Sequence, residues 1–377
     1  MGFAWRPFGE RTVLRGGYGI FYEVESSGNR VNRNMVPYTL NETVFNDGQR
    51  TMANFFTGRP IGGATTAPSL AGGYPDMPMG YDQHWSFGVQ RELPGNSVLE
   101  VNYVANRGVN LYEGNPINDP PAGPGAIQAR RPYPLFGAIT YNGQDNSTTY
   151  HALQAKYEKR YSAGLFALVS YTWSKSIGVA NVPAVGGDYA YERALTAFDI
   201  PQNLTISTGY ELPVGKGKRF LSNSSWLAKG ALAGWQVQGI LVLRSGRPFT
   251  PTISRDVSNT GIGGQRPNRI GSGKLDNPTI AQWFDKSAFV VPAAYTYGNS
   301  GASILREDRY KNLDLSLFKQ FQLTERSRLQ FRAEAFNLTI TPSFAAPGTN
   351  IDLASGGIVT STVSTPRNIQ FALKLNF

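Results

Sequence analysis

Apolar and polar residues alternate strictly at the end of the chain. Over residues 368–377 the apolar positions are Ile369, Phe371, Leu373, Leu375 and Phe377, and the positions between them are Asn368, Gln370, Ala372, Lys374 and Asn376. Successive side chains of a β-strand point to opposite faces, so a period of two gathers the apolar residues on one face. The pattern therefore predicts a strand with one apolar face and one polar face.

The same alternation recurs along the chain and predicts an all-β fold. In the segment 329–335, Phe331 belongs to an apolar face, and Arg332 and Glu334 belong to the opposite face. The predicted strands cover residues 1–8, 11–22, 81–93, 97–106, 150–161, 164–176, 201–212, 231–244, 309–321, 326–338 and 366–377.

Several of these strands are long, notably 150–161, 164–176 and 231–244. A tilted strand needs about 9–11 residues to cross a bilayer, whereas strands of globular proteins peak near 5–6. Charged residues make up 16% of the chain, against about 25% in a typical soluble domain. Length and composition favour apolar faces that meet lipid. A soluble sheet whose apolar face is a core is the alternative.

The connections between the strands alternate in length. Short ones fall at 9–10, 94–96, 162–163, 213–230 and 322–325, and long ones at 23–80, 107–149, 177–200, 245–308 and 339–365. Short periplasmic turns and long extracellular loops are typical of outer-membrane barrels, whereas loops of sandwiches vary at both ends. The alternation predicts an antiparallel transmembrane β-barrel portion.

The strand count indicates a part of a barrel. If Phe377 lies in the periplasm, eleven strands place residue 1 outside, whereas complete single-chain barrels have an even strand number. An open sheet would also leave two edges unpaired in lipid. We therefore expect residues 1–377 to supply about eleven strands of an expected 22, the barrel size whose lumen is plugged.

The remaining composition limits the chemistry. There is no cysteine, and the net charge of +10 comes from scattered Lys and Arg rather than from a basic patch, so nucleic acid is not an expected partner. His84 and His151 lack metal-ligand spacing, and the segment Gly215-Lys216-Gly217-Lys218 lacks the phosphate-loop pattern. We expect no catalytic residues, metal or cofactor, and no enzyme activity.

Several segments resemble one family of membrane receptors. They are Phe3-Ala4-Trp5-Arg6-Pro7-Phe8, Thr12–Tyr22, Tyr210–Lys218, Gly234-Trp235-Gln236-Val237, Arg244–Thr250 and Arg367–Phe377. Together they are similar to TonB-dependent outer-membrane receptors of the Oar-like group, many of which carry a carboxypeptidase-regulatory-like domain. The resemblance implies a barrel of 22 strands, filled by a plug, that imports bulky solutes with energy passed on by TonB. The signal peptide, TonB box and plug are expected to be missing from this chain.

The resemblance also implies a role for the last strand. A terminal aromatic residue with apolar residues at alternate upstream positions is similar to the signal read by the barrel-assembly machinery. The residues in question here are Phe371, Leu373, Leu375 and Phe377. An ordinary lipid-facing strand would show the same pattern, and both descriptions can hold together.

Two further groups of residues follow from the barrel hypothesis. Aromatic residues gather at membrane interfaces, so we expect an aromatic girdle from Tyr18, Trp85, Tyr171, Trp173 and Trp235. Charges opposite apolar faces should line the lumen, and these are Lys156, Glu158, Arg160, Arg332 and Glu334. The loops 23–80 and 245–308 are expected to carry the solute contacts.

The sequence thus predicts an outer-membrane transporter for an oligosaccharide, peptide or siderophore-like solute, embedded in outer-membrane lipid. One alternative is a passive porin or a surface adhesin built on a barrel. Another is a soluble secreted β-protein that binds polysaccharide. The solute is not specified by the sequence.

Overall fold

The computed structural model describes residues 1–22, 67–73, 78–179, 193–215, 218–220 and 232–377. Most of the predicted loop 23–80, the middle of 177–200 and most of the turn 213–230 lie outside these residues. The same holds for residue 231, at the start of a predicted strand.

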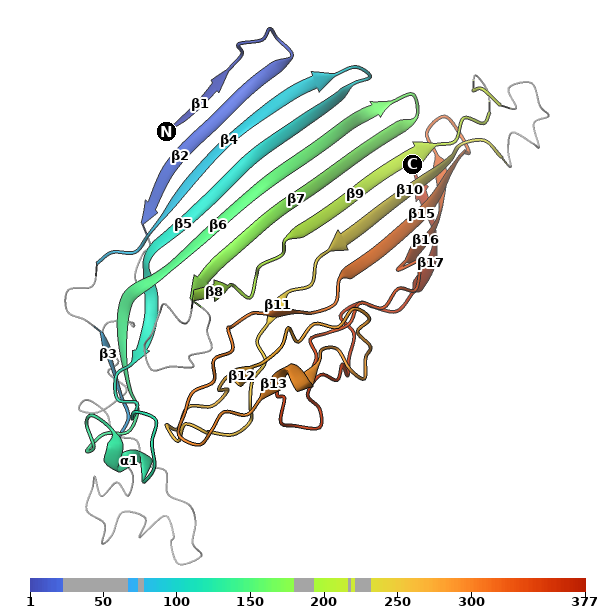
Figure 1. Ribbon diagram of the computed structural model, residues 1–377. Helices are drawn as coiled ribbons and strands as arrows, with labels where there is room; N and C mark the ends of the chain where they lie inside the picture. Colours follow the sequence, from blue (N-terminus) through green and yellow to red (C-terminus); the bar gives the residue numbers. More distant parts are fainter. Residues whose placement is uncertain (23–66, 74–77, 180–192, 216–217, 221–231) are drawn as a thin grey trace, which may run out of the picture.

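One sheet of thirteen strands contains eleven antiparallel strands whose neighbours follow the order of the chain (Figure 1). They are β1 (Gly2–Trp5), β2 (Thr12–Tyr22), β4 (Tyr81–Leu93), β5 (Ser97–Pro116), β6 (Ile139–Ser162), β7 (Leu165–Val179), β9 (Gln202–Glu211), β10 (Trp235–Arg244), β15 (Tyr310–Gln322), β16 (Arg328–Phe336) and β17 (Asn368–Asn376). Each of the eleven strands predicted from the alternation is present, which confirms the all-β, antiparallel fold.

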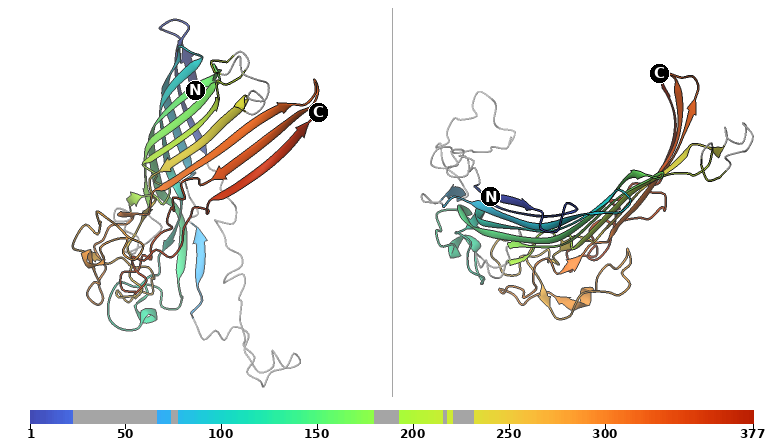
Figure 2. Two further views of the ribbon diagram at one scale, coloured as in Figure 1. Left: turned by 90° about the vertical axis from the view of Figure 1, so that its right-hand side faces the viewer. Right: turned by 90° about the horizontal axis from the view of Figure 1, so that it is seen from above.

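The two ends of the sheet differ, as the alternating connections predict. Turns between β4 and β5, β6 and β7, and β15 and β16 lie at one end, and the long loops gather at the other (Figure 1). These are called the turn end and the loop end below. Seen from above, the strands form a single curved layer (Figure 2). Its edges are β1, which pairs with β2, and β17, which pairs with β16.

Strands β5 and β6 are longer than predicted. The prediction placed residues 107–149 in a loop, but pairing continues to Pro116 and Thr140, so only the segment 117–138 connects the two strands. The register shifts between Gly108 and Leu111 and again before Glu113. Such bulges interrupt the period of two, which is why the sequence pattern ends there.

The smaller elements lie at the loop end. They are β3 (Leu70–Gly73), which runs parallel to β6, β8 (Arg193–Leu195), which pairs with β7, the helix α1 (Ile127–Arg130), and the short strands β11 (Pro248–Phe249), β12 (Asn268–Arg269), β13 (Phe289–Val290) and β14 (Leu305–Arg306). A 3-10 turn covers Lys286–Ala288.

Among the described residues, no helix combines the length and apolarity needed to span a membrane.

The turn between β6 and β7 depends on left-handed backbone. Ala163 and Gly164 have φ angles of 52° and 82°. Two consecutive positive φ angles match the right-handed twist of paired strands, and glycine adopts them at least cost. A Cβ atom on Gly164 would lie 3.2 Å from the carbonyl oxygen of Glu211 on neighbouring β9. This turn therefore fixes the approach of β9 to the hairpin.

We expect Gly164→Ala to destabilise the sheet by about 1–2 kcal/mol, because an L-residue is strained in this conformation. The midpoint of thermal unfolding, followed by far-UV circular dichroism, should fall. Gly263→Ala is the matched control, since its Cβ atom would meet open space. Equal midpoints for the two variants would contradict the assigned role of the turn.

Candidate functional site: two faces of the sheet and a folded loop cap

The strand register separates the side chains into an apolar face and a polar face. One row of paired residues on the apolar face runs through Phe87, Tyr103, Leu153 and Trp173, from β4 to β7. Another runs through Tyr210, Val237, Leu317, Ala333 and Phe371, from β9 to β17. Leu165 pairs with Tyr210 and joins the two halves on the same side. The apolar face is therefore continuous across the sheet.

The apolar face is largely uncovered. Trp173 is 60% exposed and Phe371 is 71% exposed. Within the described ranges, no second sheet or helical layer packs against the strands (Figure 2). A soluble protein rarely leaves so large a contiguous apolar surface in water. This geometry fits a sheet whose surroundings are lipid, and it does not fit one layer of a sandwich.

The predicted charged residues lie on the polar face in two groups. On β6, Lys156 Nζ lies 3.0 Å from Glu158 Oε2, and Arg160 Nε lies 4.0 Å from Glu158 Oε1. On β16, Arg332 Nη2 lies 3.9 Å from Glu334 Oε1. In the register, Lys156 and Arg332 face away from the apolar rows.

Exposed pairs of this kind contribute little to stability. The side chain of Arg160 is 74% exposed and that of Lys156 is 46% exposed. Glu334 also accepts a hydrogen bond of 2.8 Å from Gln370 Nε2 on β17, and the guanidinium of Arg332 lies 4.7 Å from the ring centroid of Phe318. The groups on the polar face are thus held in place yet open to a further partner.

The five predicted girdle residues all lie on the apolar face, at different heights. Tyr18 is paired with Trp85, nearer the loop end of β2 and β4. Tyr171 and Trp173 lie near the middle of β7. Trp235 is the first residue of β10 and therefore lies at the turn end. The structure does not bring the five together into one ring.

The two histidines lie on opposite faces. His84 is on the polar face, where its Nε2 is 2.7 Å from Asn106 Nδ2. His151 is on the apolar face, where its Nδ1 is 2.6 Å from the Tyr103 hydroxyl and its ring contacts Trp85 edge-on. The alternation of the sequence already indicates these faces. His84 is adjacent to Trp85 and so takes the opposite face, whereas His151 is two residues before the apolar Leu153 and so takes the same face. Within the described residues, no cluster of three potential metal ligands occurs.

The last strand carries its apolar residues on the exposed side. Phe371, Leu373 and Leu375 pair with apolar-face positions of β16. Phe377 directly follows the strand and is 97% exposed. The four residues predicted as an assembly signal are thus accessible along one edge of the sheet.

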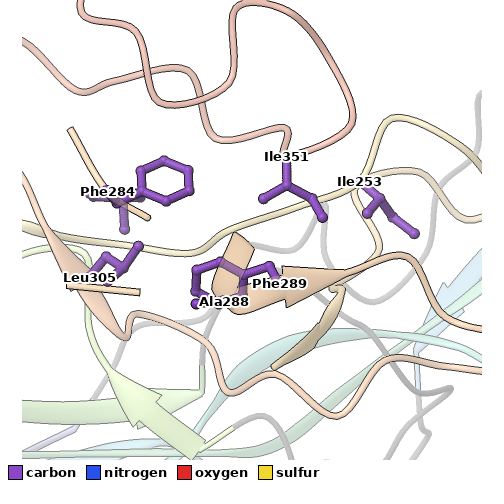
Figure 3. Close-up of a cluster of buried hydrophobic side chains, with 7 residues drawn as sticks. Ile253, Phe284, Ala288, Phe289, Leu305 and Ile351 are labelled. Atoms are coloured by element: carbon purple, nitrogen blue, oxygen red, sulfur yellow. The ribbon is translucent and has the colours of Figure 1, made fainter. Parts of the chain in front are cut away.

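A compact hydrophobic core lies in the loops rather than in the sheet. Residues 245–308 and 339–365, here called the loop cap, fold together at the loop end (Figure 1). Phe284 contacts both Phe249 and Phe289, with ring centroids 5.8 and 6.0 Å apart. The buried side chains of this core are Phe249, Ile253, Phe284, Ala288, Phe289, Leu305 and Ile351. All of them except Phe249 are labelled in Figure 3.

A family profile described as outer membrane beta barrel domain matches residues 1–370. The chain belongs to this family. The membrane-facing assignment of the apolar face follows directly, and the barrel domain is located in the outer membrane. The alternative of a soluble secreted β-protein is therefore set aside.

Solved structures of receptors and transporters share the fold of the barrel domain. The receptor FpvA of Pseudomonas aeruginosa, bound to pyoverdines, aligns with a TM-score of 0.50 and 11% identity over 100% of this chain and 32% of its own. The outer membrane transporter YddB of Escherichia coli aligns with a TM-score of 0.50 and 14% identity over 99% of this chain and 39% of its own. The barrel domain thus spans about a third of their length. A comparison with curated proteins finds no match.

Hydrogen bonds to Asp256 organise the loop cap of the barrel domain. Its carboxylate accepts from the backbone N–H groups of Thr260 and Gly261 at 3.1 and 2.6 Å, and from Gln265 Nε2 at 2.5 Å. Burial acts to raise the pKa of Asp256, but these donors outweigh it and hold the pKa below its ordinary value. The carboxylate therefore stabilises the turn at 256–265 in its charged form.

An ion pair ties the loop cap to the sheet. Arg306 Nη2 donates to Asp199 Oδ2 at 2.5 Å, and Asp199 Oδ1 accepts from the backbone N–H of Ser176 at 2.7 Å. Arg306 also donates to the carbonyl oxygen of Gly246 at 3.0 Å. Asp199 is 1% exposed, whereas the side chain of Arg306 is 34% exposed. This link joins β7, the segment before β9 and the loop cap.

A second link reaches the segment 117–138. Asn259 Nδ2 donates to the carbonyl oxygens of Gly123 and Gly125 at 2.9 and 2.8 Å. Asn118, which is fully buried, donates to the carbonyl oxygen of Gly137 at 2.6 Å and accepts from the backbone N–H of Tyr133 at 2.7 Å. The loop end is therefore one connected structure in the described residues. The sequence pattern gave no sign of these contacts.

We expect Asp256→Ala to weaken the loop cap by about 1–3 kcal/mol, because buried donors lose their acceptor. The rate of proteolytic cleavage within residues 245–308 of the membrane-embedded protein should rise. Since the pKa of Asp256 is lowered on folding, its contribution is present above about pH 4 and is lost as the pH falls through the folded-state value. Asp276→Ala, at an exposed cap position, is the control and should leave cleavage unchanged. Similar cleavage of both variants would disprove the assignment.

Proposed function

We propose that the chain is the C-terminal half of a TonB-dependent receptor barrel of the Oar-like group, which imports a bulky solute. The supporting feature is the open sheet. Within the described residues, β1 pairs only with β2, and β17 only with β16. Each edge strand would expose unpaired N–H and C=O groups to lipid, which costs several kcal/mol per group. Further strands are needed to close the sheet.

The number of strands suggests what those further strands form. Eleven strands in the sheet correspond to half of a barrel of about 22 strands. This chain covers only 32% and 39% of the two solved structures that share the fold, which leaves room for the remaining strands and a plug. A barrel of that size without a plug would be a permanently open pore, so regulated uptake requires one.

The polar face then lines the route of the solute. The pairs Lys156–Glu158 and Arg332–Glu334 bring both signs of charge to this face. In a closed barrel they are positioned to pair with plug residues or with a solute in transit. The loop cap, which is folded around its own core, forms part of the outer vestibule and is the candidate site of first solute contact.

The width of a barrel of about 22 strands is compatible with a bulky solute such as an oligosaccharide, a peptide or a siderophore-like compound. FpvA, whose structure holds pyoverdines, shares only the fold and 11% of its sequence with this chain. That likeness does not choose among the solute classes. The observation that carries the proposal is the continuous apolar face across eleven antiparallel strands with two open edges.

Conductance of the whole receptor separates a plugged transporter from a passive porin. We expect the receptor, purified from outer membranes and inserted in planar bilayers, to show no stable open channel, because the plug fills the lumen. It should also be retained by the immobilised periplasmic domain of TonB. Stable channels of large conductance together with no retention by TonB would favour a porin, and no channel with no retention would favour an adhesin.

Removal of Phe377 from the whole receptor should lower its amount in outer membranes several-fold. The physical reason is that the exposed edge of β17 loses the aromatic end of the pattern proposed to be read by the barrel-assembly machinery. Quantitative immunoblotting of membrane fractions measures the effect. Ile369→Ala, at the far end of the same strand, is the matched control. Unchanged assembly of the Phe377 deletion would refute the role.

A further inference from the structure

A groove of about 600 Å³ opens on the apolar face near the loop end of β7. Its apolar wall includes Leu153 and Trp173, which are both exposed, and Lys175 lies beside them. A second groove of about 450 Å³ is lined by Leu204 and Leu243. Both are lined by Pro201, so they are neighbours. Grooves of this size accommodate ligands of several hundred daltons.

The combined groove has a strong excess of positive charge. Its walls include five cationic side chains and a single carboxylate, that of Asp199. Arg306 is bound to that carboxylate, and Arg244 stacks on the ring of Tyr310 at 5.2 Å. Two of the five cations are therefore already engaged.

The other three are Lys175, Arg309 and Lys311, and all three are exposed. None of them forms an ion pair with a residue that the structure describes. Lys311 follows Arg309 by two residues and pairs with Leu243 on the apolar face, and Lys175 pairs with His151 on the same face. Cations on a lipid-facing surface are costly unless they reach the headgroup region or an anion.

The position of the three cations matches the outer headgroup region. They lie towards the loop end, which faces the cell exterior in barrels with long extracellular loops. Trp173 is near the middle of the long strand β7, but it pairs with Gln202, the first residue of β9, and so lies at the loop end of that neighbouring strand. Aromatic rings favour the interface between hydrocarbon and water. Below the cations the groove is apolar, with Leu153 and Leu204 in its walls.

We infer that this groove binds a phosphorylated lipid of the outer leaflet. Lys175, Arg309 and Lys311 contact the phosphate groups, and an acyl chain lies against Leu153 and Trp173. A soluble anion is the less suitable occupant, because the groove opens on the lipid-facing side and a solute in the lumen does not meet it. The lipid would bridge β7 and β15 beneath the loop cap.

Native mass spectrometry of the whole receptor, delipidated in detergent, tests this inference with diphosphorylated lipid A as the probe. Removal of cations near a membrane surface weakens binding of anionic lipid roughly fivefold for each cation. We therefore expect the triple variant Lys175→Ala, Arg309→Ala, Lys311→Ala to bind the lipid with an affinity about a hundredfold lower than that of the unmodified receptor. Lipid A without phosphates should bind the unmodified receptor as weakly as the triple variant binds the probe.

Lys374→Ala, which removes a cation from the polar face of β17, is the matched control and should retain the lipid fully. Equal retention by the triple variant and the unmodified receptor would overturn the inference. So would displacement of the lipid by millimolar inorganic phosphate, which would indicate a site for free anions. If the triple variant does not assemble, Lys175→Ala and Lys311→Ala are tested singly, and unchanged retention in both would likewise overturn it.

Discussion

The need to pair every backbone N–H and C=O group inside the membrane governs this structure. Hydrocarbon offers no hydrogen-bond partners, so only a sheet with an unbroken ladder is compatible with it. The register between β9, β10 and β15 runs without a shift. Shifts occur instead between Lys159 and Ser162 at the turn end of β6, and after Gly108 in the half of β5 nearer the loop end. The central strands thus keep an unbroken ladder of backbone hydrogen bonds.

The same hydrophobic effect produces opposite arrangements in the two parts of the chain. In the sheet, apolar side chains such as Leu373 point outward, because their surroundings are acyl chains. In the loop cap, Phe249 and Phe284 converge, because water surrounds them and burial is favourable. The sheet is surrounded by lipid and the loop cap by water. The core therefore lies in the loops, and the strands are apolar on their outer face.

The sequence predicted the strands better than the loops, for physical reasons. Alternation at Phe331, Arg332 and Glu334 reports directly which face each side chain takes, and the eleven strands follow from such local patterns. The contact of Asp199 with Arg306 spans 107 residues and has no periodic signature. Phe249 lies in a strand of only two residues and Phe284 lies in irregular backbone, so nothing in their spacing indicates that they meet. The predicted girdle and lumen residues were found on the expected faces, while their roles remain proposals.

The extra length of β6 has a consequence for what the cell displays. Twenty-four residues at roughly 3.3 Å each extend about 80 Å along the strand, whereas crossing the bilayer takes about 9–11 residues. With β5, this strand forms a stalk that carries the helix α1 well above the headgroups (Figure 1). Molecules that approach the cell surface from outside would meet this stalk before they reach the membrane-spanning strands.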